Sequence, residues 1–430
     1  MTLKSITPIL IFLMGCTAKS LHQEKEVQFQ EVDVISLSTT NYSEISTDVK
    51  VEDRQFNAAN QSWIIFDLNV PQAGRYQVKI YGSGHSDATV YLEDYVDNKE
   101  ARHYKITGQI SFDKNLGYGL VDGSPLNAGA HKIKLHIKGV AKIQKITFEL
   151  MSVHESSPQT YTQHMKGQDW AMVWSDEFNG TEIDTSKWVF DVGNWGWGND
   201  EIQYYTKANQ KNARVKEGNL IIEALKEAQT NIWTSARLTT RGKVSFLYGK
   251  IEFRARAPDK KGYWAAGWLL GDSYVDEGSW PYCGEIDILE NVGYEIHPLS
   301  GDGIAHLSVH TPAYYFKRNN QITSTTQVTD MVGSFHTYTM EWSPNEMIGL
   351  IDGVPSYVYD KTANDLEWPF YQAHNLIINL AMGGNWGGAQ GIDPYLTSQK
   401  LIIYYVRVVA KRGPPKRLVV YECNHHNNAL

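Results

Sequence analysis

The sequence has no excess of basic residues, since 40 Lys and Arg stand against 48 Asp and Glu and give a formal charge of −8. Nucleic acids and anionic membrane surfaces recruit basic side chains, so the charge argues against both as partners and favours a neutral substrate. No cluster of His and Cys has zinc-binding spacing. The glycine-rich residues 382–388 lack the strand and helix context of a dinucleotide site and the Gly-Lys-Ser/Thr of a P-loop. These absences argue against nucleotide and zinc chemistry.

Cysteine is scarce, and Cys16 is informative through its position. It follows an apolar stretch, residues 9–13, that is too short to span a bilayer stably and is typical of a signal-peptide core. Residues 13–16 resemble a bacterial lipobox, which implies cleavage before Cys16 and lipidation of its thiol. We therefore expect a signal peptide over residues 1–15, a tether over residues 16–27, and an outer-membrane lipoprotein at the periplasmic face or the cell surface.

Aromatic residues are abundant instead, at 12% of the chain with 13 Trp and 25 Tyr. Together with 35 glycines and many β-branched runs, they favour an all-β protein with many turns over a helical one. Rings stack on sugars and also fill sandwich cores, so composition leaves both roles open. The length of 430 residues predicts two or three domains. The sequence does not decide whether Cys283 and Cys423 pair or stay free.

Short alternating runs predict a small β-sandwich over residues 28–152. The clearest runs are residues 62–68, 75–81, 131–137 and 142–150. Turn signals at residues 71–74 and 127–129 separate them. We expect a polar linker over residues 153–169, a larger domain over residues 170–410, and a tail over residues 411–430.

Two segments of the smaller domain, residues 70–76 and 126–131, resemble carbohydrate-binding modules of the family 6 type. The resemblance consists mostly of core and turn positions, so it implies the fold more than a ligand. A sugar platform needs exposed aromatic side chains, and a spacer domain is an open alternative. The candidate platform residues are Tyr91, Tyr95, Tyr104 and Tyr118.

In the larger domain, residues 284–290 alternate carboxylates with apolar residues, a rare pattern because charged groups are costly to bury in strands. In a regular strand Glu285 and Asp287 share one face and Glu290 points to the other. A β-bulge at residues 288–289 would return Glu290 to the face of the other two acids. Without context, the alternative is an amphipathic strand with an exposed acidic face.

A bulged strand would bring two glutamates to catalytic distance. The Cα atoms of Glu285 and Glu290 would lie about four strand steps apart, roughly 13 Å. Side chains that lean together could approach the ~5–5.5 Å carboxyl separation of a retaining glycosidase, in which one carboxylate attacks and the other acts as acid and then base. A helix with the same spacing of five turns the two glutamates apart.

The larger domain is similar to glycoside hydrolase family 16, and most similar to its bacterial endo-1,3-β-glucanases, the laminarinases. The motifs that carry the resemblance are residues 174–180, 197–205, 234–238, 248–254, 264–269, 280–285 and 379–386, in family order. The resemblance implies a β-jelly roll with a cleft across its concave sheet, and hydrolysis that retains anomeric configuration. We expect an all-β chain in which this jelly-roll sandwich follows a smaller β-sandwich, and we expect a monomer.

Carried over residue by residue, the resemblance implies that Glu285 is the nucleophile and Glu290 the acid/base. Glu285 must be ionised to attack the anomeric carbon, and Glu290 must hold a proton to protonate the departing oxygen. Three clustered acids favour this split because like charges disfavour full ionisation and raise one pKa. We expect Asp287 to hydrogen-bond Glu285 and tune the split. The alternative for Asp287 is a strand polar group satisfied by a neighbour.

Other residues match cleft positions of relatives. Trp280 resembles the sugar-stacking Trp beside the cleaved bond. Trp264 and Trp268 share one strand face, where Trp264 is expected in the cleft and Trp268 in the cleft or the core. His310 resembles a residue near the acid/base, although a lone His in a strand is usually structural. The remaining expected substrate-binding residues are Arg237, Asn199, Asn385 and Trp386.

Many relatives bind a structural calcium far from the cleft, through backbone carbonyls near the segments matching Glu177 and Gly218 and through an Asp of the last strand. Here Tyr404 stands where the acid is expected, so calcium would lose its only anionic ligand. We expect this site to be weak or absent and no cofactor to be needed.

The leading hypothesis is a retaining endo-hydrolase of internal β-1,3-glucosidic bonds in laminarin-like β-glucans. The spacing of residues 285–290 belongs to the laminarinase and galactanase side of the family, whereas residues 201–205 favour the glucanases. Alternatives are hydrolysis of mixed-linkage β-1,3-1,4-glucan or of a red-algal galactan, and a non-catalytic glucan-binding protein. Intact Glu285 and Glu290 argue against the last alternative, because binding alone does not need a nucleophile and an acid.

Overall fold

The computed structural model describes residues 34–97, 102–162 and 170–411. In these ranges the chain is built of strands, with two short 3₁₀ helices, η1 (Gly293–Glu295) and η2 (Phe316–Arg318), so the all-β prediction is confirmed. No helix of the described ranges is long and apolar enough to cross a membrane. Cys16 and Cys423 lie outside the described residues, and the lipid anchor stays a prediction.

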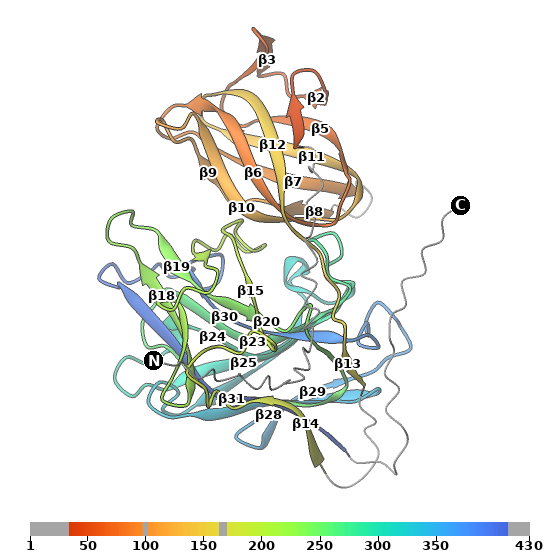
Figure 1. Ribbon diagram of the computed structural model, residues 1–430, viewed down its shortest axis with the longest axis vertical. Helices are drawn as coiled ribbons and strands as arrows, with labels where there is room; N and C mark the ends of the chain where they lie inside the picture. Colours follow the sequence, from red (N-terminus) through yellow and green to blue (C-terminus); the bar gives the residue numbers. More distant parts are fainter. Residues whose placement is uncertain (1–33, 98–101, 163–169, 412–430) are drawn as a thin grey trace, which may run out of the picture. The chain divides into compact units, whose positions relative to one another are not determined.

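The first β-sandwich, here called the N-terminal sandwich, packs two six-stranded sheets together (Figure 1). One sheet has the order β10-β6-β12-β4-β3 with β1 beside β12, and the other β2-β5-β11-β7-β8 with β9 beside β7. The strands are β1 (Ile35–Ser38), β2 (Tyr42–Ile45), β3 (Val49–Glu52), β4 (Gln55–Ala58), β5 (Ser62–Val70), β6 (Gly74–Gly84), β7 (Thr89–Asp97), β8 (Arg102–Lys105), β9 (Ile110–Ser111), β10 (Tyr118–Leu126), β11 (Gly129–Lys138) and β12 (Ala141–Val153).

The four alternating runs predicted from the sequence are strands β5, β6, β11 and β12. In β6, buried residues alternate with partly exposed ones because successive side chains of a strand point to opposite faces. The buried side chains, with Phe56, Phe66 and Phe148 among the largest, form the core between the two sheets. The hydrophobic pattern of this segment therefore sets which face of each strand is covered.

The tyrosines considered for a sugar platform have different surroundings. Tyr104 is buried, and its hydroxyl donates to the backbone oxygen of Trp280 at 3.3 Å. The Tyr91 ring stacks on His136 with centroids 4.5 Å apart. Tyr104 is therefore not an exposed platform residue, and sugar binding by this sandwich stays a prediction.

The second β-sandwich, here called the C-terminal sandwich, has a nine-stranded and a ten-stranded sheet. In Figure 1, β23, β24, β25 and β30 lie in one layer and β14, β28, β29 and β31 in the other. The nine-stranded sheet contains β13 (Thr160–Thr162), β15 (Val189–Asp191), β20 (Arg237–Thr239), β21 (Ser245–Leu247), β23 (Tyr263–Gly271), β24 (Glu285–Val292), β25 (Gly303–His310), β26 (Ile322–Val328) and β30 (His374–Met382).

The ten-stranded sheet contains β14 (Trp170–Asp176), β16 (Tyr204–Tyr205), β17 (Ala213–Lys216), β18 (Asn219–Lys226), β19 (Trp233–Ser235), β22 (Gly249–Arg256), β27 (His336–Trp342), β28 (Glu346–Ile351), β29 (Val354–Asp360) and β31 (Ser398–Lys411). Apolar residues of both sheets, such as Phe253 on β22, Ile378 on β30 and Val408 on β31, are fully buried in one core between them. One face of β23, β24 and β30 thus packs inward, which leaves their other face for a site.

The segment predicted as a linker contributes a strand. β13 pairs in parallel with β21, and the Tyr161 ring stacks on Phe246 at 5.8 Å. Edge strand β21 offers unpaired backbone groups, so three residues of suitable β-propensity suffice to extend the sheet.

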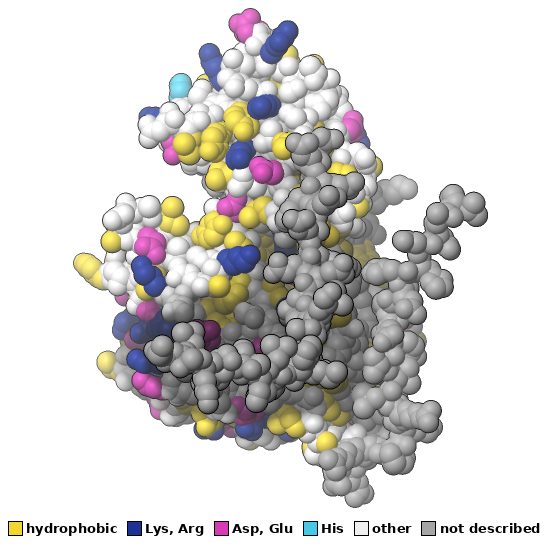
Figure 2. Space-filling model, viewed as in Figure 1, with side chains coloured by type: hydrophobic (Ala, Val, Ile, Leu, Met, Phe, Trp, Pro, Cys, Tyr) yellow, Lys and Arg dark blue, Asp and Glu magenta, His cyan; other side chains and the backbone are white. Residues whose placement is uncertain are grey.

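On the surface, acidic and basic side chains are interspersed over the face visible in Figure 2.

Two leucines give a matched test of the core. Leu380 on β30 is fully buried in the C-terminal core, whereas Leu299 is 92% exposed in a loop. We expect Leu380→Ala to lower the free energy of unfolding by about 2–5 kcal/mol, because it leaves a cavity. Leu299→Ala should change it by less than about 0.5 kcal/mol. Urea denaturation followed by tryptophan fluorescence measures both, and equal effects would contradict the assignment of the core.

Candidate active site

Strand β24 contains the predicted bulge. Along β23, Gly267 pairs with Leu289 and Trp268 with Asp287, so Ile288 is skipped. Along β25, the register shifts by one residue between Asp287 and Glu290. Ile288 and Leu289 are both buried in the core, which explains the extra residue: two successive apolar side chains point inward and reverse the parity of the strand.

The bulge brings the three acids to one side of the sheet. Glu285, Asp287 and Glu290 line one cleft together with Trp264 and Trp268 of the neighbouring strand β23. Further lining residues come from loops and from β20, β25 and β30. The acids therefore lie on the outer face of β24, opposite the core.

Each acid receives a hydrogen bond from a named donor. The Trp280 Nε1–H donates to Glu285 Oε2 at 2.9 Å, and the Trp264 Nε1–H donates to Glu290 Oε1 at 2.9 Å. The Ser308 hydroxyl lies 3.0 Å from Asp287 Oδ2 and 3.3 Å from Glu290 Oε2. We expected Asp287 to bond to Glu285, but its donor is Ser308 of β25, because cross-strand pairing places that residue opposite Asp287.

Burial raises the pKa of all three acids, because the charged form loses hydration in the cleft wall. It raises the pKa of Glu285 to about 8, and the charge of Glu290 adds to the rise while the Trp280 donor opposes it. It raises the pKa of Glu290 to about 7, against the effect of His306, Trp264 and Ser308. It also raises the pKa of Asp287 strongly. The cluster therefore holds at least one proton near neutral pH.

His310 lies beside Glu285 rather than beside Glu290. Its Nε2 is 3.6 Å from Glu285 Oε1 and 3.5 Å from Asp287 Oδ2, and burial lowers the pKa of His310 to about 3, so the ring is neutral. The residue that pairs with Glu290 across the strands is His306, which we did not predict from the sequence. His306 precedes His310 by an even spacing on β25, a signal that could have indicated it.

Three of the other expected residues line the cleft. Arg237 Nε donates to Asp191 at 3.0 Å, and its guanidinium lies 4.8 Å from the ring centroid of Trp268. The Trp268 Nε1–H donates to Asn379 at 2.8 Å. Trp268 therefore lies in the cleft and is held there by its contacts with Arg237 and Asn379. Asn199 also lines the cleft.

Asn385 and Trp386 lie outside the set of residues that line the cleft. The Asn385 backbone N–H donates to the carbonyl of Asn199 at 2.8 Å, which ties the glycine-rich loop to the neighbouring loop. The Trp386 ring packs edge-on against Trp264 at 5.1 Å and against His306 at 4.8 Å. Both residues thus support cleft residues by contact.

Comparisons with known proteins agree with this geometry. Residues 197–400 match glycosyl hydrolases family 16. A beta-glucanase of Rhodothermus marinus is 43% identical over 252 residues, which are 56% of this chain and 86% of that protein. A glucan endo-1,3-beta-glucosidase of Cryptopygus antarcticus is 35% identical over 239 residues, which are 52% of this chain and 85% of that protein.

The chain belongs to glycosyl hydrolase family 16. The solved laminarinase of Rhodothermus marinus superposes with a TM-score of 0.52 at 43% identity, over 56% of this chain and 98% of that chain. The structure of SCLam, a non-specific endo-beta-1,3(4)-glucanase of the same family, superposes with a TM-score of 0.53 at 35% identity, over 60% of this chain and 97% of that chain. The predicted jelly-roll sandwich is thereby confirmed.

Several lining residues of this family 16 cleft were not singled out from the sequence. They are Trp195, Trp197, Glu201, Tyr274, Glu277, Phe316 and Asn379. Glu201 is buried, its pKa is raised to about 7 by burial, and it accepts hydrogen bonds from Gln203 and Tyr205. Trp197 and Glu201 fall inside the motif of residues 197–205, but Tyr274 comes from a loop and Phe316 from the short helix η2, which give no periodic signal.

Two residues at the expected structural-calcium site have other partners. Tyr404 packs against Phe335 at 5.8 Å, and Arg254 lies 5.1 Å from its ring. The Glu177 carboxylate is taken by Arg407 through two hydrogen bonds of 2.9 and 2.7 Å. Neither residue thus offers a free carboxylate, and weak or absent calcium binding stays a prediction.

Removing the charge of Glu290 should separate the two catalytic roles. We expect Glu290→Gln to lower polysaccharide hydrolysis by about 10²–10⁴-fold, because the departing oxygen loses its proton donor. Cleavage of an aryl glycoside with an activated leaving group should persist, and azide should accelerate it. The acidic limb of that reaction should move to lower pH, because the charge that raises the pKa of Glu285 is gone.

The matched control is Glu341→Gln, since Glu341 pairs with Lys250 on the opposite sheet. Kinetics with and without azide across a pH series measure the effect. Equal loss on both substrates with no azide response would remove Glu290 from the acid/base role.

Proposed function

We propose that this protein is a retaining endo-hydrolase of internal β-1,3-glucosidic bonds in laminarin-like β-glucans. The observation that carries the proposal is the bulged strand β24, which presents Glu285, Asp287 and Glu290 on one face of an aromatic-lined cleft. Membership of glycosyl hydrolase family 16 and the activities named for its relatives support it.

In the first step, Glu285 Oε attacks the anomeric carbon while the bond from that carbon to the leaving oxygen breaks. Glu290 gives its proton to the leaving oxygen, and a glycosyl ester on Glu285 results. The hydrogen bond from Trp280 to Glu285 stabilises the ionised nucleophile. Since the charge of Glu290 raises the pKa of Glu285, a protonated Glu290 favours an ionised Glu285.

In the second step, Glu290 removes a proton from water, and the oxygen attacks the anomeric carbon. The ester bond breaks and Glu285 leaves as a carboxylate, so the sugar regains its first configuration. Trp264 remains a donor to Glu290 in both steps and favours its ionised form after the first proton transfer. Ser308 contacts both Asp287 and Glu290, and His310 Nε2 lies 3.5 Å from Asp287 and 3.6 Å from Glu285.

The cleft suits a neutral polysaccharide. Trp264, Trp268 and Trp280 present ring faces or edges that can pack on pyranoses, and Arg237, Asn199 and Asn379 offer donors and acceptors for hydroxyl groups. A mixed-linkage β-1,3-1,4-glucan is a second candidate, because the neighbour SCLam is named as a non-specific endo-beta-1,3(4)-glucanase. We further propose that Cys16 carries a lipid anchor, on the strength of the lipobox alone.

Incubation with laminarin, lichenan and agarose, followed by oligosaccharide profiling, tests the substrate. We expect laminari-oligosaccharides from laminarin, with the β-anomer formed first in NMR spectra. Glu285→Gln should abolish turnover and leave glucan binding intact, because it keeps the shape of the side chain and removes the nucleophile. Release from agarose but not from laminarin would contradict the proposal.

A further inference from the structure

The N-terminal sandwich contacts loops of the C-terminal sandwich that also line the cleft. Asp122 of β10 and Asn194 are joined twice: the Asp122 N–H donates to Asn194 Oδ1 at 2.9 Å, and the Asn194 N–H donates to the Asp122 carbonyl at 3.1 Å. A Cβ atom on Gly193 would lie 2.3 Å from that carbonyl, so only glycine permits this approach. Trp195 and Trp197 of the same loop are cleft residues.

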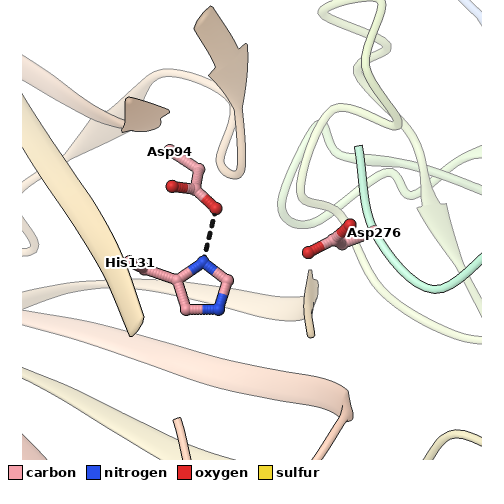
Figure 3. A group of neighbouring side chains, drawn as sticks. All are labelled: Asp94, His131 and Asp276. Carbon is pink, nitrogen blue, oxygen red and sulfur yellow. Dashed lines mark hydrogen bonds and ion pairs between the residues drawn. The ribbon is translucent and has the colours of Figure 1, made fainter. Parts of the chain in front are cut away.

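The N-terminal sandwich also contacts the loop over residues 274–280. Figure 3 shows Asp94 and His131 of the N-terminal sandwich near Asp276 of this loop. His131 bonds Asp94 at 2.6 Å and the Asn127 carbonyl at 2.9 Å, while the Asn127 N–H donates to Asp276 at 2.9 Å. Both ring nitrogens of His131 are thus engaged, which makes this group an ion pair rather than a metal site. Burial lowers the pKa of His131, but the hydrogen bond and charge of Asp94 raise it more.

Arg75, near the start of β6, approaches three aromatic rings that line the cleft. Its guanidinium lies 5.9 Å from the Trp195 ring, 5.6 Å from the Trp197 ring and 5.9 Å from the Tyr274 ring. Its Nη1 is buried and has no hydrogen-bond partner among the described residues. A guanidinium is weakly hydrated and stacks on aromatic faces, so the three rings supply its main contacts at this end.

These contacts continue into the cleft. Arg237 lies 4.8 Å from the Trp197 ring and 4.8 Å from the Trp268 ring. Cations and rings therefore alternate from Arg75 through Trp197 and Arg237 to Trp268, and the last three line the cleft. Arg75 is thus linked through Trp197 to residues that line the cleft, although Arg75 itself is not a lining residue.

We propose that the N-terminal sandwich is a structural part of the substrate cleft and that Arg75 is a positioning residue for glucan binding. It holds Trp197, and through it Arg237, in the geometry that packs on the sugar chain. The proposal rests on the proposed function for its substrate class. It gives the N-terminal sandwich a role that requires no sugar site of its own.

Arg75→Met keeps the length of the apolar stem and removes the cation. We expect KM for laminarin to rise about five- to tenfold while kcat stays within about twofold, because the reacting acids are untouched and one cation–π group is lost. Arg75→Lys keeps a charge without the planar group, so KM should rise about two- to threefold. In a Glu285→Gln background, calorimetric titration with laminarihexaose should show the same ratios in Kd.

The matched control is Lys145→Met, which removes a cation 4.6 Å from the Tyr81 ring within the N-terminal sandwich. It should leave KM and kcat unchanged. Unchanged KM and Kd in Arg75→Met overturn the proposal, as does a loss of kcat that follows a lowered melting temperature with KM unchanged. If Arg75→Met does not fold, Arg75→Lys is the deciding variant, and an unchanged KM in that variant overturns the proposal.

A wrong substrate assignment can be distinguished from a wrong role for Arg75. If the parent chain cleaves lichenan or agarose but not laminarin, the proposed substrate is wrong, and the Arg75 variants are compared on the polysaccharide that is cleaved. Unchanged KM on that polysaccharide overturns the role of Arg75 and leaves the hydrolase activity standing.

Discussion

The site depends on the extra residue in strand β24. A regular strand would turn Glu290 into the core, where an acid without a partner is costly, and would remove the proposed proton donor from the cleft. Ile288 and Leu289 prevent this because both are buried in the core and shift the parity by one residue. Hydrophobic burial thus fixes a catalytic geometry, and the large core between the two sheets keeps the bulge in place.

The surroundings of the acids then determine how readily the cluster holds protons. Burial raises the pKa of Glu285, Asp287 and Glu290. The Trp280 indole donates a hydrogen bond to Glu285, and the Trp264 indole donates one to Glu290. Because the carboxyl groups repel one another when charged, one proton within the pair is the stable arrangement at neutral pH. One glutamate can therefore be ionised while the other holds the proton, as the proposed mechanism requires, and the neighbouring indoles donate hydrogen bonds to both.

Much of the fold could be predicted because strand period and turn chemistry are local. The runs that became β5, β6, β11 and β12 followed from the alternation of apolar residues. The parity of the three acids suggested the bulge of β24, but the alternation alone left a regular amphipathic strand open. Contacts that join distant segments were not predictable in the same way. Ser308 as the donor to Asp287 and the burial of Tyr104 against Trp280 depend on register and packing across the fold. The contact between the Trp386 and Trp264 rings was not predictable either, because a loop sets the position of Trp386.

Covalent trapping tests most directly the proposed role of Glu285 as the nucleophile on the bulged strand. Treatment with a 2-deoxy-2-fluoro laminaribioside that carries an activated leaving group should trap the glycosyl ester, because the fluorine slows its hydrolysis more than its formation. Mass spectrometry of the digested protein should find the added sugar on Glu285, and free laminarihexaose should protect against labelling. Sugar on Asp287 or Glu290, or inactivation without a covalent adduct, would contradict the account.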